Sequence, residues 1–327
     1  MDKKLYNYLL VSTILTLITS ALCLDWYLFW HQPSAKNSAI ITQVTIHPGD
    51  STRKIYNSLK DTHLFSRPYY LKIYLYYQSL FKYIKYGDYL INPQQSPTDI
   101  IQQILNGQVR LYSFTIIPGT TWKQLQENIN SSSIIQKILT TSSIKDFCRK
   151  HNIPSLEGWL APDSYFISRG TTDKAFIAMA IQQQKKNLIK ISQSQPCTLD
   201  LHDTVTLASI IEKESSRVDE YSLISSTYIN RLKKGMKLQS DPTVRYGSTT
   251  TGERLYYFDL EIEHPYNTYK HRGLPPSAIS YPSKKALDAA CHPQKSDFLF
   301  FVAEPKNQYH IFTKTYSEHL NVQKSFK

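Results

Sequence analysis

Residues 204–216 read TVTLASIIEKESS and predict an apolar helix that ends in alternating charges. Asp203 stands just before this run and is a favourable N-cap residue. Glu212 and Glu214 are two positions apart, so on a helix their side chains point about 200° away from each other. Only one of the two carboxyl groups can therefore face a given cleft.

Glu214 continues the apolar face of this predicted helix. It follows Ile210 by four residues, Ile211 by three and Leu207 by seven, and these spacings define one helical face. Burial on that face would raise the pKa of the Glu214 carboxyl, whereas the neighbouring cations would lower it. The same pattern is typical of a surface glutamate at a helix end, so a functional and a structural interpretation both stay open.

A larger α/β region surrounds this helix. Its other predicted elements are helices at residues 122–129, 172–190 and 223–232 and strands at residues 111–117, 298–303 and 310–313. Residues 238–243 and 265–269 are predicted to lie in an alternation of strands and loops. The larger region thus begins near residue 110 and extends to the C-terminus.

Residues 44–109 predict a small α+β module. Strand patterns at residues 44–47 and 87–91 alternate with helices that begin after Ser51 and Ser96. Between them, residues 69–89 carry eight tyrosines with interleaved lysines. That stretch is typical of an amphipathic helix that packs its rings into a core, or of a surface that stacks sugars or lies near a bilayer.

The N-terminus predicts a membrane anchor. Residues 5–24 contain no charged residue, and about 20 apolar positions cross the hydrocarbon layer as a helix. Lys3 and Lys4 precede the run and an aromatic belt begins at Trp26, which favours a cytoplasmic N-terminus with the bulk of the chain in the periplasm or outside. The alternatives are a cleaved signal peptide and a lipoprotein modified at Cys23.

Composition bounds the class of protein. The chain has 327 residues, enough for two domains, and its net charge is +12. With 41% hydrophobic and 20% charged residues it is neither wholly disordered nor a polytopic membrane protein. Besides Cys23 there are three cysteines, which allow at most one disulfide, so the fold is not a disulfide scaffold.

Several chemistries have no motif in the sequence. It contains no Gly-rich phosphate loop, no G-x-S-x-G elbow and no H-E-x-x-H pair. The ten histidines lack close ligand spacing, so we expect neither a metal nor a cofactor. Cys291 is interpreted as a packing residue. Carboxylates remain as the candidate reactive groups.

Six motifs occur in order along the larger region: EGWLAPDSY (157–165), LASIIEKES (207–215), YINRLKKGMKLQSDPTVRYG (228–247), PYNTY (265–269), GLPP (273–276) and AACHP (289–293). With these motifs the sequence resembles the endolytic murein transglycosylases, the YceG-like family. Residues 44–109 resemble that family's LysM-like module. The resemblance covers most of the chain beyond the predicted anchor.

The resemblance implies a fold and an activity. The implied fold is α+β: a cytoplasmic tip and transmembrane helix at residues 1–31, a linker at 32–43, a LysM-like module at 44–109 and a mixed α/β catalytic domain at 110–327. The implied enzyme is a lyase of the inner membrane that cleaves the MurNAc–GlcNAc bond within peptidoglycan strands and leaves 1,6-anhydro-MurNAc ends. Its implied partners are synthases of the elongation or division machinery, and cutting would release nascent strands. Nucleic acid is not an expected partner, because the bulk of the chain is predicted to lie outside the cytoplasmic membrane.

By match to the motif, Glu214 carries the chemistry. Candidate sugar-binding residues are Gln239, Ser240, Asp241, Tyr266, Asn267, Tyr269, Glu157 and Asp163, although each is also compatible with a turn or structural role. A single carboxyl group suffices if the sugar's own C6 hydroxyl is the nucleophile. Two alternatives stay open: a hydrolase in which Asp241 or Asp163 serves as a second carboxylate, and a non-catalytic wall-binding scaffold.

Overall fold

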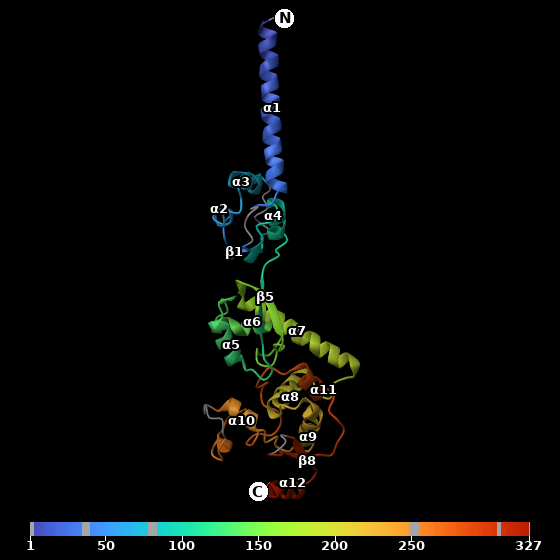
Figure 1. The fold of residues 1–327 in the computed structure, drawn as a ribbon. Coiled ribbons are helices and arrows are strands. Elements are labelled where there is room, and N and C mark those ends of the chain that lie inside the picture. The colour runs from blue at the N-terminus through green and yellow to red at the C-terminus, as the bar shows by residue number, and fades with distance from the viewer. Residues whose placement is uncertain (1–2, 35–39, 78–83, 249–254, 306–308, 327) are drawn as a thin grey trace. The chain divides into compact units, whose positions relative to one another are not determined.

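The computed structural model describes residues 3–34, 40–77, 84–248, 255–305 and 309–326 (Figure 1). The first of two units comprises Met1–Tyr112, Ser133–Ile135 and Phe166–Thr171, and the second comprises Ser113–Ser132, Gln136–Tyr165 and Thr172–Lys327. The predicted mixture of helix and sheet is confirmed. The LysM-like character of the first module and the domain bounds stay predictions.

The first unit is built on a two-stranded antiparallel sheet. Its elements are α1 (Lys3–His31), β1 (Thr42–Ile46), α2 (Thr52–Lys60), α3 (Pro68–Tyr77), β2 (Gly87–Ile91) and α4 (Pro97–Leu105). Val44 of β1 lies opposite Tyr89 of β2. The Ser51 side chain caps α2, and Ser96 forms a capping box with Asp99 at the start of α4. Both predicted helix starts are confirmed.

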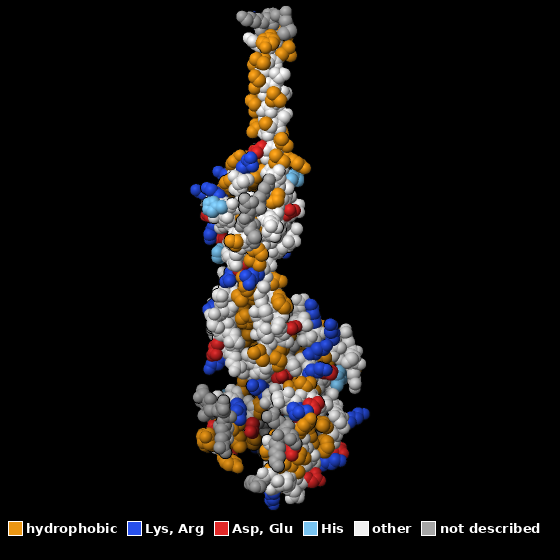
Figure 2. Space-filling model, in the orientation of Figure 1, with side chains coloured by type: hydrophobic (Ala, Val, Ile, Leu, Met, Phe, Trp, Pro, Cys, Tyr) orange, Lys and Arg blue, Asp and Glu red, His pale blue; other side chains and the backbone are white. Residues whose placement is uncertain are grey.

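The helix α1 runs from the apolar N-terminus into the core of the first unit. Phe29 and Trp30 near its end are buried in the same core as Tyr70 and Leu71 of α3. Its remaining length is largely exposed, and Figure 2 shows hydrophobic side chains along it. Among the described residues, α1 is the one helix long and apolar enough to cross a membrane.

The tyrosine-rich stretch forms α3 and continues into β2. Tyr70 and Leu75 of α3 are buried, as an amphipathic helix requires, whereas Tyr69 and Tyr76 are exposed. Tyr89 is fully buried in β2. Residues 78–83, in the middle of the stretch, lie outside the described residues. The packing interpretation therefore holds for one face of α3 only.

The second unit is mainly helical. Its helices are α5 (Trp122–Ser131), α6 (Ile144–Lys150), α7 (Asp173–Ser194), α8 (Leu201–Glu214), α9 (Tyr221–Lys233), α10 (Asp241–Gly247), α11 (Lys284–Cys291) and α12 (Tyr316–Ser325). Its strands are β7 (Phe300–Ala303) and β8 (His310–Thr313). The bounds of the two units divide the remaining strands, which are β3 (Leu111–Thr115), β4 (Ile135–Gln136), β5 (Ser164–Ser168) and β6 (Thr171–Thr172). The strands pair as β3 with β5, β4 with β6, and β7 with β8.

The buried helix of the second unit is α8, which packs against α9 and α11 (Figure 1). Leu207, Ala208, Ile210 and Ile211 have no exposed surface. A side chain on this helix also fixes the chain that crosses it, because Ser209 Oγ accepts a hydrogen bond from the backbone N–H of Ile279 at 3.0 Å. The apolar run predicted as a helix is thus the core element of this unit.

One disulfide joins Cys197, just before α8, to Cys291 at the end of α11. This agrees with the limit of one disulfide outside the N-terminus. Cys291 is fully buried, as its interpretation as a packing residue requires. Because its sulfur is bonded, it offers no thiol for catalysis. The disulfide closes a loop of 94 residues around α8, α9 and α10.

Two local predictions are wrong. The cap of α8 is Asp200, whose side chain accepts from the N–H of Asp203 at 2.8 Å, so Asp203 lies inside the first turn. Residues 241–243, which belong to the stretch 238–243 predicted as strand or loop, begin α10, and Pro242 stands in its first turn, where no backbone N–H is needed. The C-terminal helix α12 has no counterpart in the prediction.

Candidate active site

Glu214 is the last residue of α8. Protein atoms surround its carboxyl group on most sides, while part of the side chain keeps contact with solvent. Glu212 lies elsewhere: its carboxylate accepts from the Ser283 backbone at 2.9 Å and from the Tyr221 hydroxyl at 3.4 Å. The structure therefore separates the two glutamates as the helical spacing predicts.

The two oxygens of the Glu214 carboxyl have different surroundings. Oε1 accepts hydrogen bonds from the Tyr228 hydroxyl of α9 and from Ser240 Oγ, the latter at 2.5 Å. Within the part of the chain that the structure describes, Oε2 has no hydrogen-bond partner. The group is therefore held in one orientation through Oε1, and Oε2 is available to a ligand.

The pKa of Glu214 is raised above its usual value. Burial is the main cause, and the negative charge of Asp241 adds to it. The hydrogen bonds from Ser240 and Tyr228 and the nearby His310 act in the opposite direction because they favour the carboxylate. Burial outweighs them, so Glu214 keeps its proton to a higher pH than a free glutamic acid.

A buried pair positions His310 near this carboxyl. His310 Nδ1 lies 2.7 Å from Glu220 Oε2, and the His310 backbone N–H donates to the other Glu220 oxygen at 2.6 Å. Ser215, which follows Glu214, also donates to Glu220, at 3.1 Å. Glu220 thus ties the strand β8 to the residue next to the candidate catalytic group.

Two cavities share Glu214 and Asp241 in their walls. One measures about 510 Å³ and also contacts Thr121, Arg245 and Tyr246. The other measures about 380 Å³. Besides Glu214 and Asp241, its lining residues are Tyr228, Arg231, Leu238, Gln239, Tyr269, Phe300, Phe301, Val302, Ala303, His310, Tyr316, His319 and Gln323. A carboxyl group at the junction of two cavities can reach the bond between two bound units of a polymer.

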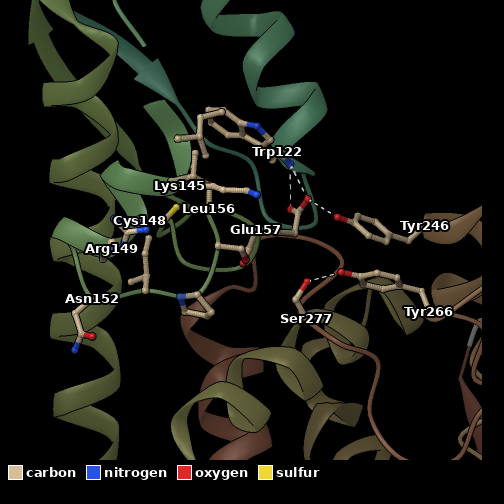
Figure 3. A pocket seen from close by; sticks show the side chains of 14 residues that line it. Trp122, Lys145, Cys148, Arg149, Asn152, Leu156, Glu157, Tyr246, Tyr266 and Ser277 are labelled. Atoms are coloured by element: carbon tan, nitrogen blue, oxygen red, sulfur yellow. Dashed lines mark hydrogen bonds between the residues drawn. The ribbon is translucent and has the colours of Figure 1, made fainter. Parts of the chain in front are cut away.

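A third cavity of about 810 Å³ shares Tyr246 with the first (Figure 3). Its wall holds Glu157, whose carboxylate accepts from the Trp122 backbone at 3.0 and 3.1 Å and from the Tyr246 hydroxyl at 3.0 Å. Burial raises the pKa of Glu157 to about 7, against these hydrogen bonds. Tyr266 lines the same cavity and its hydroxyl lies 2.6 Å from Ser277 Oγ (Figure 3).

The structure brings most of the predicted site residues to these cavities. Gln239, Ser240, Asp241 and Tyr269 lie beside Glu214, where the Tyr269 hydroxyl donates to Asp241 at 2.7 Å. Glu157 and Tyr266 line the third cavity. Ser240, Asn267 and Asp163 line none of the three, although Ser240 donates to the Glu214 carboxyl.

Asn267 and Asp163 serve the local backbone instead. Asn267 is 1% exposed, and its side-chain amide donates to the carbonyls of Leu260 and Ile262 while accepting from the Tyr269 N–H. The Asp163 carboxylate is exposed and accepts from the N–H of Ser164 at 2.8 Å. The Asn267 amide is thus occupied by the local backbone. A contact of either residue with substrate stays a prediction.

Sequence reasoning missed Tyr228, Arg231 and His310. Tyr228 was assigned only to the helix predicted at residues 223–232, although a tyrosine hydroxyl on a buried face needs a polar partner. Arg231 was given no role beyond its place in the motif at residues 228–247. Arg231 is buried and donates to the carbonyls of Leu299 and Leu238, at 2.6 and 2.7 Å. These bonds fix the chain just before Gln239.

The described residues bring together one set of possible metal ligands, Cys197, Cys291 and His292. Both sulfurs of this set are joined in the disulfide. His292 is engaged with Asp288, 2.9 Å from its Nδ1. The set is therefore explained by the disulfide and its surroundings.

Comparison with known proteins gives consistent results. Residues 44–325 match the model of the YceG-like family. An "Endolytic murein transglycosylase" of Bacillus subtilis (strain 168) is 29% identical over 316 residues, covering 90% of this chain and 87% of that protein. One of the same name from Streptococcus pneumoniae (strain ATCC BAA-255 / R6) is 26% identical, and the match covers 83% of this chain but only 56% of that longer protein. A crystal structure of a YceG-like protein from Listeria monocytogenes aligns with a TM-score of 0.55 and 27% identity, covering 87% of this chain and all of that one.

Proposed function

The chain belongs to the YceG-like family, and from this membership we propose that it is an endolytic murein transglycosylase. Its substrate is the glycan strand of peptidoglycan, cut internally at the MurNAc–GlcNAc bond. The product ends in 1,6-anhydro-MurNAc. Cutting of this kind would terminate or release nascent strands, and synthases of the elongation or division machinery are the partners we expect.

The observation that supports this proposal best is the asymmetric binding of the Glu214 carboxyl. Oε1 is held by two hydroxyl donors, Oε2 has no hydrogen-bond partner among the described residues, and the Glu214 side chain lines two cavities. A strand threaded through both cavities would place saccharide units on either side of Oε2. That arrangement fits a cut within a chain rather than at its end.

One carboxyl group can perform both proton transfers of the reaction. Protonated Oε2 gives its proton to the glycosidic oxygen, and the bond from that oxygen to C1 of MurNAc breaks. The C6 hydroxyl oxygen of the same sugar then bonds to C1, and its proton passes to the Glu214 carboxylate. The sugar thus supplies its own nucleophile, no water is consumed, and the enzyme returns to its protonated form.

The raised pKa of Glu214 suits this cycle because the first step needs the acid form. Tyr228 and Ser240 then stabilise the carboxylate that forms when the proton leaves. The positive charge that develops at C1 needs a nearby negative group. Asp241, which lines both cavities, can supply it.

We assign the remaining site residues by the cavity that each of them lines. Gln239, Asp241 and Tyr269 are proposed to contact the sugars next to the scissile bond. Ser240 is proposed to act through its hydrogen bond to the Glu214 carboxyl. Glu157 and Tyr266 are proposed to contact a unit farther along the strand, since their cavity adjoins the first through Tyr246.

We further propose that α1 is a single-pass anchor in the cytoplasmic membrane, with the N-terminus inside and the chain after α1 outside. The length and apolar character of α1 support a span. The Cys197–Cys291 disulfide supports an oxidising compartment for the second unit.

A hydrolase is the nearest alternative. Asp241 is the one candidate for its second carboxylate that lines the same cavities as Glu214, because Asp163 lines neither. A scaffold that only binds the wall is the other alternative. The test for both is the product: anhydro ends support the transglycosylase, ends that carry added water support the hydrolase, and binding without fragments supports the scaffold.

The decisive variant is Glu214→Gln in the full chain, tested on un-cross-linked glycan. We expect cleavage to be lost while the thermal unfolding transition is kept. Glu127→Gln is the matched control, because Glu127 is an exposed helical glutamate in α5. Unchanged cleavage by Glu214→Gln would remove this carboxyl from the mechanism.

A further inference from the structure

Helix α3 of the first unit has an exposed face that is apolar and aromatic. Tyr69, Ile73 and Tyr76 are 51%, 43% and 81% exposed. Their spacing of four and three residues places them on one side of the helix. Lys72 is exposed beside them. The opposite face packs into the core through Tyr70 and Leu75.

This helix is fastened to α1 where the apolar run of α1 ends. The Tyr70 hydroxyl donates to Asp25 at 2.8 Å, and Arg67 forms an ion pair with the same carboxylate. The ring of Trp26 meets that of Tyr70 at 4.8 Å between centroids. Asp25 directly follows the uncharged run, so α3 lies at the level where α1 would leave the hydrocarbon layer (Figure 1).

The distance between the end of the uncharged run and the core of the first unit is too short to leave a gap between that core and the bilayer. From Leu24 to the buried Phe29 a helix rises only about 8 Å. The headgroup layer on each side of a bilayer is itself about 5–8 Å thick. The core of the first unit therefore begins at the depth of the lipid headgroups if α1 spans the membrane.

A cavity beside this face is suited to an anionic headgroup. It measures about 520 Å³, and its described lining includes Arg53, Tyr56, Lys72 and Tyr76 but no carboxylate. Tyrosine is favoured at the membrane interface, because its ring contacts the apolar side of the interface while its hydroxyl contacts water. Two cations next to exposed tyrosines match the phosphate of an anionic phospholipid.

We propose that the α3 face and this cavity form a second membrane contact, which lies in the headgroup layer and binds anionic phospholipid. The contact holds the first unit against the bilayer instead of leaving it suspended from the anchor. This inference rests on the proposed membrane span of α1 and is independent of the glycan chemistry.

The test uses the full chain, carrying Cys23→Ala, in vesicles of phosphatidylglycerol and phosphatidylcholine. An environment-sensitive fluorophore is attached at Ile73→Cys, and quenchers are placed on the lipids near the headgroups. The matched control is Gln108→Cys. Gln108 is exposed and lies just after the C-terminal end of α4. The opposite end of α4 is the one that contacts α1, because Thr98 donates a hydrogen bond to the Trp30 carbonyl at 2.7 Å.

We expect lipid-borne quenchers to reduce the fluorescence at Ile73→Cys and to leave that at Gln108→Cys unchanged. Changing Arg53 and Lys72 to Gln should lower the ratio of membrane-bound to free label about fivefold per charge removed. Equal access of a water-soluble quencher to both labels would overturn the inference. So would displacement of the α3 face from the bilayer by inorganic phosphate or soluble glycan, which would assign the cavity to those ligands.

Extraction with alkaline carbonate separates this inference from its premise. A chain that stays in the vesicles while Ile73→Cys remains in water would refute the α3 contact alone. A chain that is washed away would refute both the span and the contact. Neither outcome changes the products released from glycan, so the proposed activity is judged separately.

Discussion

Replacing Tyr228 by Phe tests how the protonation of Glu214 is controlled. The Tyr228 hydroxyl is one of two donors to Oε1, and it favours the charged form of the carboxyl. A hydrogen bond to a charged group contributes about 1.5–3 kcal/mol. Since one pKa unit corresponds to about 1.4 kcal/mol, losing this donor should raise the pKa of Glu214 by about 1–2 units.

The assay is the pH dependence of kcat/KM for release of glycan fragments. Because the first step needs protonated Glu214, activity falls on the alkaline side as the carboxyl ionises. In Tyr228→Phe that fall should move to higher pH by about 1–2 units, for the reason given above. The hydrogen bond from Ser240 should keep the carboxyl oriented in the variant.

The matched control is Tyr221→Phe. Tyr221 lies on the same helix and donates to Glu212 at 3.4 Å, so it makes the corresponding contact with the other glutamate. Its replacement should leave the alkaline fall in place. An alkaline fall that is unmoved in Tyr228→Phe, or that moves to lower pH, would refute this account of the site.

Three other predictions concern stability. The pKa of Glu157 is raised from 4.5 to about 7, so its contribution to stability is full below pH 4.5 and is lost as pH rises through 7. The free energy of unfolding measured by chemical denaturation should fall by about 3 kcal/mol over this pH range in the wild type and not in Glu157→Gln. An equal pH dependence in both proteins would contradict this prediction. Replacing Cys197 and Cys291 by Ala should cost about 2–4 kcal/mol, because the disulfide closes a loop of 94 residues, and an unchanged melting temperature would argue against it. Asp200→Ala should cost about 1 kcal/mol by removing the cap of α8, whereas Asp203→Ala should cost less if Asp200 is the cap.

The position of Glu214 could be predicted because it depends on a local repeat. Its spacing from Leu207, Ile210 and Ile211 fixes the face of α8 on which it lies, whatever the rest of the chain does. The direction of its pKa could not be predicted. That direction depends on how much of the unit covers the carboxyl, which is a property of the tertiary packing.

The partners of Glu214 could not be identified from spacing alone. Tyr228 and Ser240 stand 14 and 26 residues away along the chain, and His310 lies on strand β8. They meet Glu214 only after α9, the loop before α10 and β8 have packed. The motif around residue 240 suggested Ser240 as a sugar ligand, whereas the structure makes it a hydrogen-bond donor to the carboxyl.

Turn residues and ligands look alike in a sequence. Asn267 was a candidate because amides bind sugars, but its amide is used by the backbone of residues 260–269. The segment at Asp241 was predicted as strand or loop because Asp-Pro favours turns, although the same pair also starts a helix. In both cases the packing of the surrounding chain determines which role the residue takes, and a short motif does not reveal that packing.

The most direct test of the central claim is the fate of water during cleavage. Purified full-length protein would digest un-cross-linked glycan in water labelled with heavy oxygen, and the fragments would be weighed by mass spectrometry. If the C6 hydroxyl of the sugar closes the ring, the fragments are lighter by one water than the products of hydrolysis, and they carry no label. Fragments that carry the heavy oxygen at the new end would contradict the one-carboxyl mechanism assigned to Glu214.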